Sequence, residues 1–464
     1  MRLEVPTWTT SAALLSSILL VPVGCKRAPP PGEAPGVVEE VPSTSAAPAP
    51  RRCSEVKPGA VFLIGEPGAA VADPDDEEVA LPAGAELGGA VAYAGGFAVA
   101  ASRTQPDGTS ALLVLLTPDG ASGRTVDLGR THGDVDPPRV AATGDQIYLI
   151  VPDRDAGGTS LRLARVRGGE LAWGTVFSQR EADSPGSALA VGPEQGIVVW
   201  DEWDRKASRG IVRKSTFATG DIGKATAPKT ISPDHGDVEA PQVAPRPGGY
   251  WLAWISHSSY SADGGAPKRP AVVEDPESVV DLGPRWLEIV PLGLDGVPTA
   301  APQIATPKEA QVLVFDLTTA PDGDAWLAWR DDRSSPGVEK TTVHLARVRP
   351  DGSVERQVVE DENLGAGVPN LLVDERPGAG QPAAWLALAG VNDATRVAAL
   401  DPREQLRDPL GPEPAIRSAE PVALLGGKLL LARPRGTAVE LSVVTCRPGG
   451  RPVGDAGPGD PEPD

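Results

Sequence analysis

A two-part phrase that recurs along the chain constrains its fold more than any other feature. Trp-Leu-Ala-Trp at 326–329 is followed by an Asp/Arg-rich stretch, and then by His-Leu-Ala-Arg-Val at 344–348 before Pro350-Asp351-Gly352. The first part recurs at 251–254, and the second recurs at 161–166 as Leu-Arg-Leu-Ala-Arg-Val. Self-similarity at a period of about 50 residues indicates a repeat architecture, and all-β repeats of this size are typical of β-propeller blades.

Seven short apolar runs form one equivalent column of strands. Near-continuous apolar runs of this length predict strands that are buried on both faces, as an inner strand between neighbouring blades would be. The runs lie at 97–101, 148–151, 197–200, 251–254, 326–329, 385–388 and 429–432. A second strand follows each run, and several of these strands end in Asp-Gly, a strong hairpin signal because glycine supplies the positive φ of the turn. We therefore predict an all-β fold, a β-propeller of seven blades with about four strands each.

The N-terminus carries a targeting pattern. An apolar stretch at 12–23 stops at Gly24-Cys25 and is shorter than the roughly 20 residues of a membrane-spanning helix. It resembles a bacterial lipoprotein signal, which implies cleavage before Cys25 and diacylation of the Cys25 sulfur. An ordinary secreted protein that is cleaved nearby, or a different start of translation, is the alternative. We assign 1–24 to the signal peptide, 25–50 to the lipidated cysteine with a Pro/Ala-rich tether, 51–447 to the propeller and 448–464 to a disordered tail.

The cysteine count supports closure of the ring between its two ends. If Cys25 is lipidated, Cys53 and Cys446 remain, one at each border of the body, and an exported compartment permits their pairing. The strands near Val422, Leu430 and Leu441 leave the seventh blade without an outer strand. The apolar residues 60–64 near the N-terminus are the candidate for it. We expect a Cys53–Cys446 disulfide at this seam; two free thiols are the alternative.

Together these motifs resemble bacterial β-propeller repeat lipoproteins, in which a Trp-ending strand, an Asp/Arg stretch and an Ala-Arg-Val strand ending in Pro-Asp-Gly recur around the ring. The resemblance covers about residues 53–447. It implies the fold and a place in the bacterial cell envelope, as an outer-membrane lipoprotein facing the periplasm or the cell surface. It does not imply an activity, because one fold hosts many functions.

The charge limits the partners that the chain can take. The formal net charge is −20, which argues against nucleic acid and against docking on an anionic membrane surface. We therefore expect the membrane to be contacted through the N-terminal lipid anchor, and we expect a monomer.

No catalytic constellation is evident in the sequence. Four histidines occur without metal-ligand spacing, and nucleophile elbows and phosphate loops are absent. The Asp/Arg stretches at 153–155, 201–205 and 330–333 are expected to be loops in which an aspartate caps its own turn or pairs with arginine. We predict no cofactor. A structural Ca²⁺ at Asp153-x-Asp155-x-Gly157 is the one metal alternative, and it lacks the further carboxylates of a strong site.

One segment breaks the repeat and is the first candidate for a binding loop. Residues 256–284 are far longer than their counterparts, and long loops in compact domains are functional or disordered. The candidate binding residues there are Tyr260, Asp263, Lys268 and Arg269. The leading functional hypothesis is non-catalytic binding or scaffolding of a protein or glycan partner by an envelope lipoprotein. A propeller glycan hydrolase of the sialidase-like class and a purely structural envelope component are the alternatives.

Overall fold

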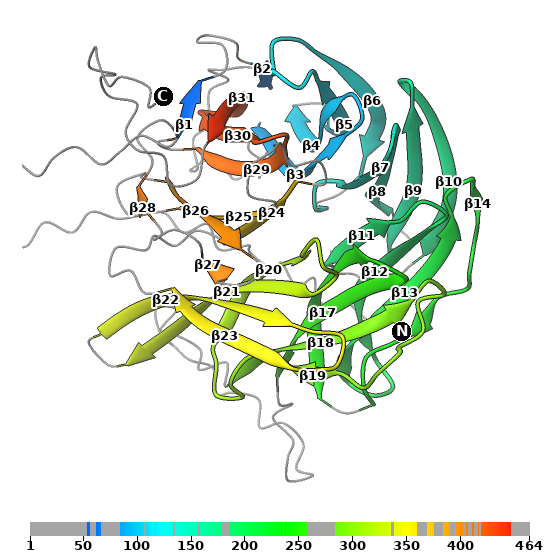
Figure 1. Ribbon diagram of the computed structural model, residues 1–464. Helices are drawn as coiled ribbons and strands as arrows, with labels where there is room; N and C mark the ends of the chain where they lie inside the picture. Colours follow the sequence, from blue (N-terminus) through cyan, green and yellow to red (C-terminus); the bar gives the residue numbers. More distant parts are fainter. Residues whose placement is uncertain are drawn as a thin grey trace, which may run out of the picture. The chain divides into compact units, whose positions relative to one another are not determined.

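The computed structural model contains an all-β body that begins at Cys53 (Figure 1). The residues that it describes are 53–55, 62–65, 84–105, 108–132, 135–155, 158–178, 186–234, 236–257, 284–335, 338–359, 369–374, 384–389, 395–401, 405–406, 411–412, 416 and 419–446. The segments assigned to the signal peptide, the tether and the C-terminal tail lie outside them. In the described part of the chain, no helix has the length and apolar character that crossing a membrane requires.

Seven antiparallel sheets of four principal strands succeed one another along the chain, and each is one blade. Blade 1 contains β3 (Gly84–Tyr93), β4 (Gly96–Gln105), β5 (Gly108–Leu116) and β6 (Gly123–Thr131). Blade 2 contains β7 (Arg139–Thr143), β8 (Gln146–Asp155), β9 (Gly158–Arg167) and β10 (Glu170–Ser178). Blade 3 contains β11 (Ser187–Val191), β12 (Gln195–Asp204), β13 (Arg209–Ala218) and β14 (Asp221–Ala225), with β15 (Lys229–Thr230) also paired to β13.

The same strand order continues through the rest of the ring. Blade 4 contains β16 (Asp237–Arg246), β17 (Gly249–His257), β18 (Arg285–Gly293) and β19 (Gln303–Ile304). Blade 5 contains β20 (Val312–Thr319), β21 (Ala325–Ser335), β22 (Val338–Val348) and β23 (Val354–Val359). Blade 6 contains β24 (Asn370–Val373), β25 (Ala384–Ala389), β26 (Thr395–Asp401) and β27 (Gln405–Leu406), with β28 (Gly411–Pro412) also paired to β26. Blade 7 contains β29 (Glu420–Leu425), β30 (Lys428–Arg435) and β31 (Ala438–Cys446).

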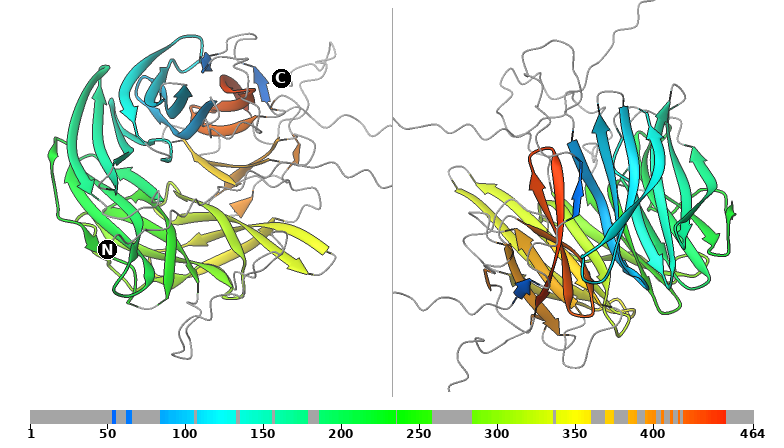
Figure 2. Two further views of the ribbon diagram at one scale, coloured as in Figure 1. Left: turned by 180° about the vertical axis from the view of Figure 1, so that it is seen from behind. Right: turned by 90° about the horizontal axis from the view of Figure 1, so that it is seen from above.

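The blades close into a ring around their innermost strands. These strands contact one another in the cycle β3, β7, β11, β16, β20, β24, β29 and back to β3, and the views in Figure 2 show the blades arranged around this axis. The prediction of a seven-bladed propeller is confirmed.

Two N-terminal strands complete blade 7, as the seam prediction requires. β1 (Cys53–Glu55) and β2 (Phe62–Ile64) both pair antiparallel with β31, the last strand of the chain. Cys53 is the register partner of Cys446, with their Cα atoms 4.0 Å apart, and the two form a disulfide. The disulfide and the closure of the ring by its two ends are both confirmed. β1 is a second N-terminal strand beside the expected outer strand at 60–64.

The second strand of each blade is buried on both faces because a neighbouring blade covers each side. In β17, Trp251, Ala253 and Ile255 belong to the core that blade 4 shares with blade 5. The alternate residues, among them Leu252 and Trp254, belong to the core shared with blade 3. Burying a side chain such as Leu252 contributes about 1.5–3 kcal/mol. The core therefore consists of layers between blades, and this arrangement explains the repeated apolar column.

The Asp/Arg stretches differ from the expectation of loops. Residues 153–155, 201–204 and 330–333 continue the second strands β8, β12 and β21 beyond their apolar parts. The hairpins to the third strands lie further along, so these residues keep the antiparallel pairing of the blade. Short polar extensions of this kind remain strands because the partner strand is equally long, which a single strand's composition does not reveal.

Candidate functional site

The innermost strands begin at one end of the ring, which we call the entry face. In each blade this end also carries the connection between the second and third strands, because the first two strands are antiparallel. In blade 4, β17 ends there at His257 and β18 begins there at Arg285. The predicted binding residues Tyr260, Asp263, Lys268 and Arg269 fall between these strands and lie outside the described residues.

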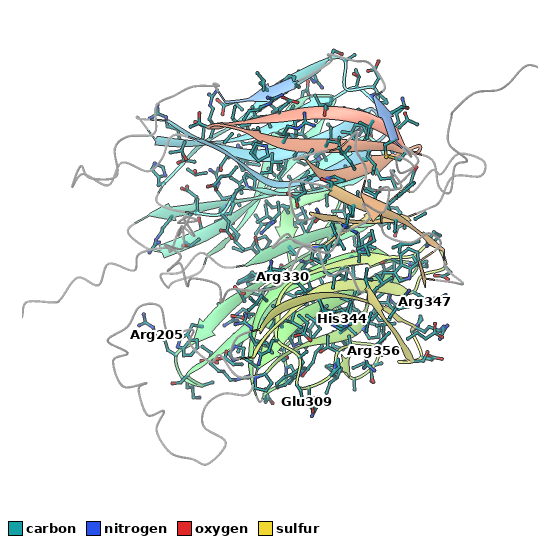
Figure 3. The ribbon with its side chains drawn as sticks, turned by 90° about the vertical axis from the view of Figure 1, so that its left-hand side faces the viewer. Arg205, Glu309, Arg330, His344, Arg347 and Arg356 are labelled. Carbon is teal, nitrogen blue, oxygen red and sulfur yellow. A yellow bond between two sulfur atoms is a disulfide. The ribbon has the colours of Figure 1, made fainter. Side chains whose placement is uncertain are left out.

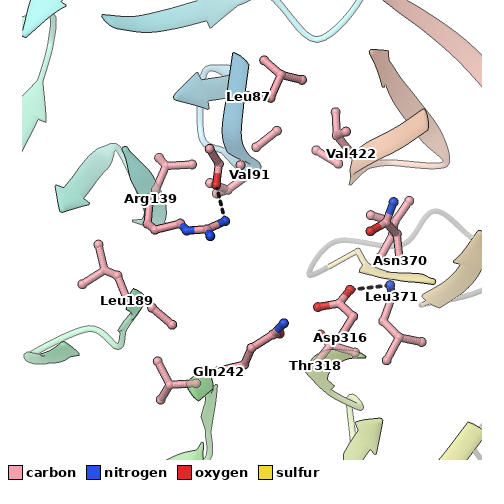
Figure 4. Close-up of a pocket in the computed structure, with 18 of the residues that line it drawn as sticks. Leu87, Val91, Arg139, Leu189, Gln242, Asp316, Thr318, Asn370, Leu371 and Val422 are labelled. Atoms are coloured by element: carbon pink, nitrogen blue, oxygen red, sulfur yellow. Dashed lines mark hydrogen bonds between the residues drawn. The ribbon is translucent and has the colours of Figure 1, made fainter. Parts of the chain in front are cut away.

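A cavity with a volume of about 610 Å³ occupies the centre of the ring and is lined by the innermost strands of all seven blades (Figure 4). Its apolar wall includes Leu87, Val91, Leu189 and Val422. Its polar side chains include Arg139, Gln242, Asp316, Asn370 and Glu420. The lining combines polar and apolar groups, and the volume lies within the usual range of ligand sites.

Several of these polar side chains join two neighbouring blades. The Asp316 carboxylate on β20 accepts a hydrogen bond from the Leu371 N–H on β24 at 2.6 Å, and one from the Leu317 N–H at 2.9 Å. The Gln242 amide on β16 donates to the Phe315 carbonyl at 2.6 Å and accepts from the Leu317 N–H at 3.2 Å. These bonds occupy backbone groups on the inner edge of each sheet, which otherwise has no partner strand.

Three further bridges extend this pattern around the ring. Arg139 on β7 donates to the Gly88 carbonyl on β3 at 3.0 Å. The Asn370 amide on β24 donates to Glu420 on β29 at 2.7 Å. At the junction of blades 3 and 4, Asp201 accepts from the Ala240 N–H at 2.7 Å. The polar groups around the cavity are therefore held in fixed orientations by adjacent blades.

Register shifts in two of the innermost strands change the direction of the side chains that line the cavity. The register of β16 against β17 shifts between Glu239 and Gln242, and that of β3 against β4 shifts at Gly88. Ala240, inside the β16 irregularity, has a φ of 50°, a left-handed conformation that is uncommon for a residue with a side chain. β-Bulges bend a strand and redirect its side chains, and they are over-represented near functional sites.

Two of the bridging carboxyl groups have raised pKa values. Burial raises the pKa of Asp316 to about 6, against the effect of the Leu371 and Leu317 N–H groups, and the nearby Glu420 raises it further. Burial likewise raises the pKa of Asp201 to about 6, against the effect of the backbone N–H groups that it accepts. Both carboxyl groups therefore change charge near neutral pH, where desolvation and hydrogen bonding compete.

The described histidines lie in pairs with aspartates that belong to the strand framework. His132 Nδ1 lies 3.0 Å from Asp153, which also accepts the His132 N–H at 2.9 Å. His344, which is labelled in Figure 3, stacks on Trp329 with ring centroids 5.0 Å apart, and its Nε2 lies 3.8 Å from Asp331. Asp331 accepts the Gln311 N–H at 3.1 Å. These aspartates cap backbone groups of other segments, whereas the sequence had suggested that they cap their own turns.

The described part of the chain contains no cluster of side chains that supports the Ca²⁺ alternative. Among those residues, no group of three or more His, Cys, Asp or Glu side chains is arranged to hold a metal ion. Asp153 is engaged with His132, and the side chain of Asp155 and the backbone at Gly157 lie outside the described residues.

An exposed tryptophan marks the entry face of blade 3. Trp203 lies near the end of β12 and is 55% exposed, although tryptophan is usually largely buried. The hairpin that follows is held by Asp204, which accepts the Lys206 and Ala207 N–H groups at 2.9 and 3.2 Å. Arg205 stands in the same turn (Figure 3). The hairpin therefore presents an aromatic surface to solvent in a fixed position.

The cavity residues were missed by the sequence analysis. They are distributed over all seven innermost strands, so no local motif groups Arg139 with Asp316 or Asn370. The repeat could have located the innermost strands, but it gives no signal for which polar residues face the axis. None of the described tyrosines lines the cavity, and Tyr148 and Tyr250 instead donate to the Thr219 and Gln195 carbonyls.

Comparison with known proteins assigns no family to the chain. No protein-family model matches the chain, and no curated protein matches its sequence. Hydrazine synthase of Kuenenia stuttgartiensis is similar in structure, with 13% identity, a TM-score of 0.47, and coverage of 77% of this chain and 96% of that one. The α-L-arabinofuranosidase Arb93A of Fusarium graminearum has 12% identity and a TM-score of 0.45, covering 76% and 99%. The β-propeller domain of the Trilobed protease of Pyrococcus furiosus has 7% identity and a TM-score of 0.43, covering 78% and 93%.

Proposed function

We propose that the protein is a lipid-anchored component of the bacterial cell envelope that binds a protein or glycan partner at the entry face without catalysis. Lipidation at Cys25 and the Pro/Ala-rich tether would hold the propeller at the outer membrane, facing the periplasm or the cell surface. The observation that carries the binding role is the set of polar side chains around the cavity, each fixed by a neighbouring blade. Such an array favours recognition because ordered side chains lose little conformational entropy when a ligand binds.

The hydrogen bonds that Asp316 already accepts from the backbone favour binding over catalysis. A general acid or base must exchange a proton with its substrate, with its hydrogen bonds aimed at the reacting atom. The two carboxylate oxygens of Asp316 each accept a backbone N–H, so the carboxylate orients strands β20 and β24. The exposed Trp203 supports the same role, because tryptophan is enriched among the residues that dominate binding energy at interfaces.

Site-specific crosslinking in intact cells tests the binding role. A photoreactive amino acid at position 203 is expected to capture one discrete partner after detergent extraction. The same amino acid at position 173 is the matched control, since Trp173 is also exposed, at 37%, but lies on the outer strand β10. Equal capture at both positions, or none at 203, would contradict a partner at the entry face. Deletion of 258–283 in the same experiment tests the long insertion.

The anchor is tested separately. Cys25→Ser is expected to release the protein from the membrane fraction and to abolish incorporation of a palmitate analogue. Cys53 and Cys446 serve as internal controls, because the disulfide holds both sulfurs. Membrane association that survives the substitution would exclude Cys25 as the anchor.

A glycan hydrolase is the second candidate, and one observation favours it. Asp316, whose pKa is raised to about 6, and Glu420 line one cavity, and glycoside hydrolysis uses a pair of carboxyl groups. Release of reducing sugar from envelope glycans by the wild-type protein, lost in Glu420→Gln, would establish this activity in place of simple binding.

A further inference from the structure

The charged and polar groups of the cavity lie on opposite walls. Arg139 belongs to blade 2, whereas Asp316 and Asn370 belong to blades 5 and 6, which face blade 2 across a ring of seven. Figure 4 shows Arg139 on one side of the opening and Asp316 and Asn370 on the other. Among the described residues that line the cavity, Arg139 is the one basic side chain.

We propose that this cavity binds a saccharide that carries a carboxylate, such as a uronic acid unit, with its carboxylate at Arg139 and its hydroxyl groups at Asp316 and Asn370. The inference rests on the proposed binding function and names the ligand class of the same site.

Arg139 is suited to a carboxylate on the ligand. A guanidinium presents five donors in a planar fork that matches a carboxylate with two parallel hydrogen bonds. One donor of Arg139 goes to the Gly88 carbonyl, which fixes the side chain. The two acidic side chains in the same cavity, Asp316 and Glu420, disfavour a ligand of high negative charge, so a single carboxylate fits better than a phosphate dianion.

The opposite wall is suited to hydroxyl groups. A carboxylate oxygen has two acceptor positions, so Asp316 can accept a ligand O–H in addition to the backbone N–H groups that hold it. Asn370 is held in place by the hydrogen bond that it donates to Glu420, and its amide oxygen can accept a hydrogen bond from a hydroxyl group of the ligand. The apolar side chains Leu87, Val91 and Val422 complete the wall and can contact the C–H face of a sugar ring.

The separation of the two walls argues against a free amino acid. Its ammonium and carboxylate share one carbon atom, whereas Arg139 and Asp316 lie on opposite walls of the cavity. A saccharide carries its carboxylate and its hydroxyl groups on different carbons, and one or two rings fill a cavity of about 610 Å³ more completely.

Calorimetric titration of the mature detergent-purified protein tests the inference. The probes are disaccharides that carry one galacturonate, glucuronate or mannuronate unit, with the corresponding neutral disaccharides and a glucosamine disaccharide as comparisons. At least one uronate is expected to bind at least 10-fold more tightly than its neutral counterpart. Equal affinity for the neutral sugar, tighter binding of the glucosamine disaccharide, or no binding of any uronate would overturn the inference.

Variants locate the site. Arg139→Gln is expected to weaken uronate binding at least 10-fold and to remove the preference over neutral sugar, whereas Arg139→Lys, which keeps the charge without the fork, is expected to be intermediate. Arg124→Gln is the matched control, because Arg124 lies on the outer strand β6 and lines a different pocket. Should Arg139→Gln fail to fold, Glu420→Gln is the second variant. It removes one negative charge from the cavity and keeps an acceptor for Asn370, so it is expected to strengthen uronate binding. Unchanged uronate binding in both Arg139→Lys and Glu420→Gln would exclude this cavity.

This experiment separates the two proposals. A partner captured at position 203 together with no uronate binding would overturn the ligand class and leave the binding function standing. Uronate binding that persists in the absence of any captured partner would identify the cavity ligand and contradict the entry-face partner.

Discussion

The Asp316 carboxylate accepts the Leu371 N–H at 2.6 Å and thereby joins the innermost strands of blades 5 and 6. The contact connects positions 55 residues apart, and it lies at the edge of the central cavity. The same side chain therefore stabilises the ring and shapes the candidate binding site, so a change there is expected to affect both.

Asp316→Ala should lower the free energy of unfolding by about 1–3 kcal/mol, because it leaves the Leu371 and Leu317 N–H groups without their acceptor. Urea denaturation followed by tryptophan fluorescence measures this difference. Asp127→Ala is the comparison, since Asp127 accepts an exposed N–H of Gly129 within its own strand and is expected to cost less. An equal decrease in the free energy of unfolding of the two variants would show that the hydrogen bond between blades stabilises the protein no more than a local one.

Stability should fall as the pH rises from about 4 to about 6. The folded-state pKa of Asp316 and that of Asp201 are each raised from 3.8 to about 6, so the folded protein binds more protons than the unfolded chain within that window. Linkage then makes the free energy of unfolding decrease with pH there, by up to about 3 kcal/mol for each group.

Chemical denaturation at pH 4, 5, 6 and 7 measures this dependence. Asp316→Asn removes one titrating group and should flatten the slope, whatever its effect on stability at a single pH. A slope that is unchanged in this variant would assign the pH dependence to other groups.

Loss of the Cys53–Cys446 disulfide should lower the free energy of unfolding by about 2–5 kcal/mol, since the bond closes nearly the whole body and restricts the unfolded chain. Thermal unfolding with and without reductant, and of the Cys53→Ser/Cys446→Ser double variant, measures this effect. Identical unfolding temperatures in all three samples would mean that β-pairing at the seam closes the ring unaided.

Gly88→Ala should destabilise the protein by about 1–3 kcal/mol, because a Cβ at position 88 would lie 1.9 Å from the Pro138 carbonyl oxygen at the junction of blades 1 and 2. Gly220→Ala is the matched control, since a Cβ there meets no atom within 4 Å. Thermal unfolding of both variants makes the comparison. The Arg139 contact to the Gly88 carbonyl should weaken as well, so uronate affinity is a second readout.

Trp203→Ala should reduce partner capture at the entry face with little change in stability, because its side chain is 55% exposed and contributes little to the core. Co-purification from detergent extracts, beside the unfolding temperature of the purified variant, separates the two effects. A large drop in unfolding temperature would indicate a structural role for this indole.

The sequence by itself determined the repeat, the number of blades and the seam. Apolar runs such as 251–254 can be recognised in the sequence because every blade contains a strand that is covered on both faces. Each blade therefore repeats the same residue types. Asp-Gly turns such as Asp351-Gly352 can be recognised because the turn requires a positive φ, which glycine adopts easily. The φ of Gly352 is 86°. The Cys53–Cys446 pair followed from counting cysteines at the two borders of one closed body.

Only the tertiary structure decided the central cavity and the use of the acidic residues. Arg139, Asp316 and Asn370 lie in three strands far apart in the sequence, and closure of the ring alone places them around one space. Asp201 and Asp331 read as caps of their own turns, but they accept N–H groups of Ala240 and Gln311. Local composition specifies which strands form, whereas a hydrogen bond between blades depends on bulges and register that arise when the sheets pack together.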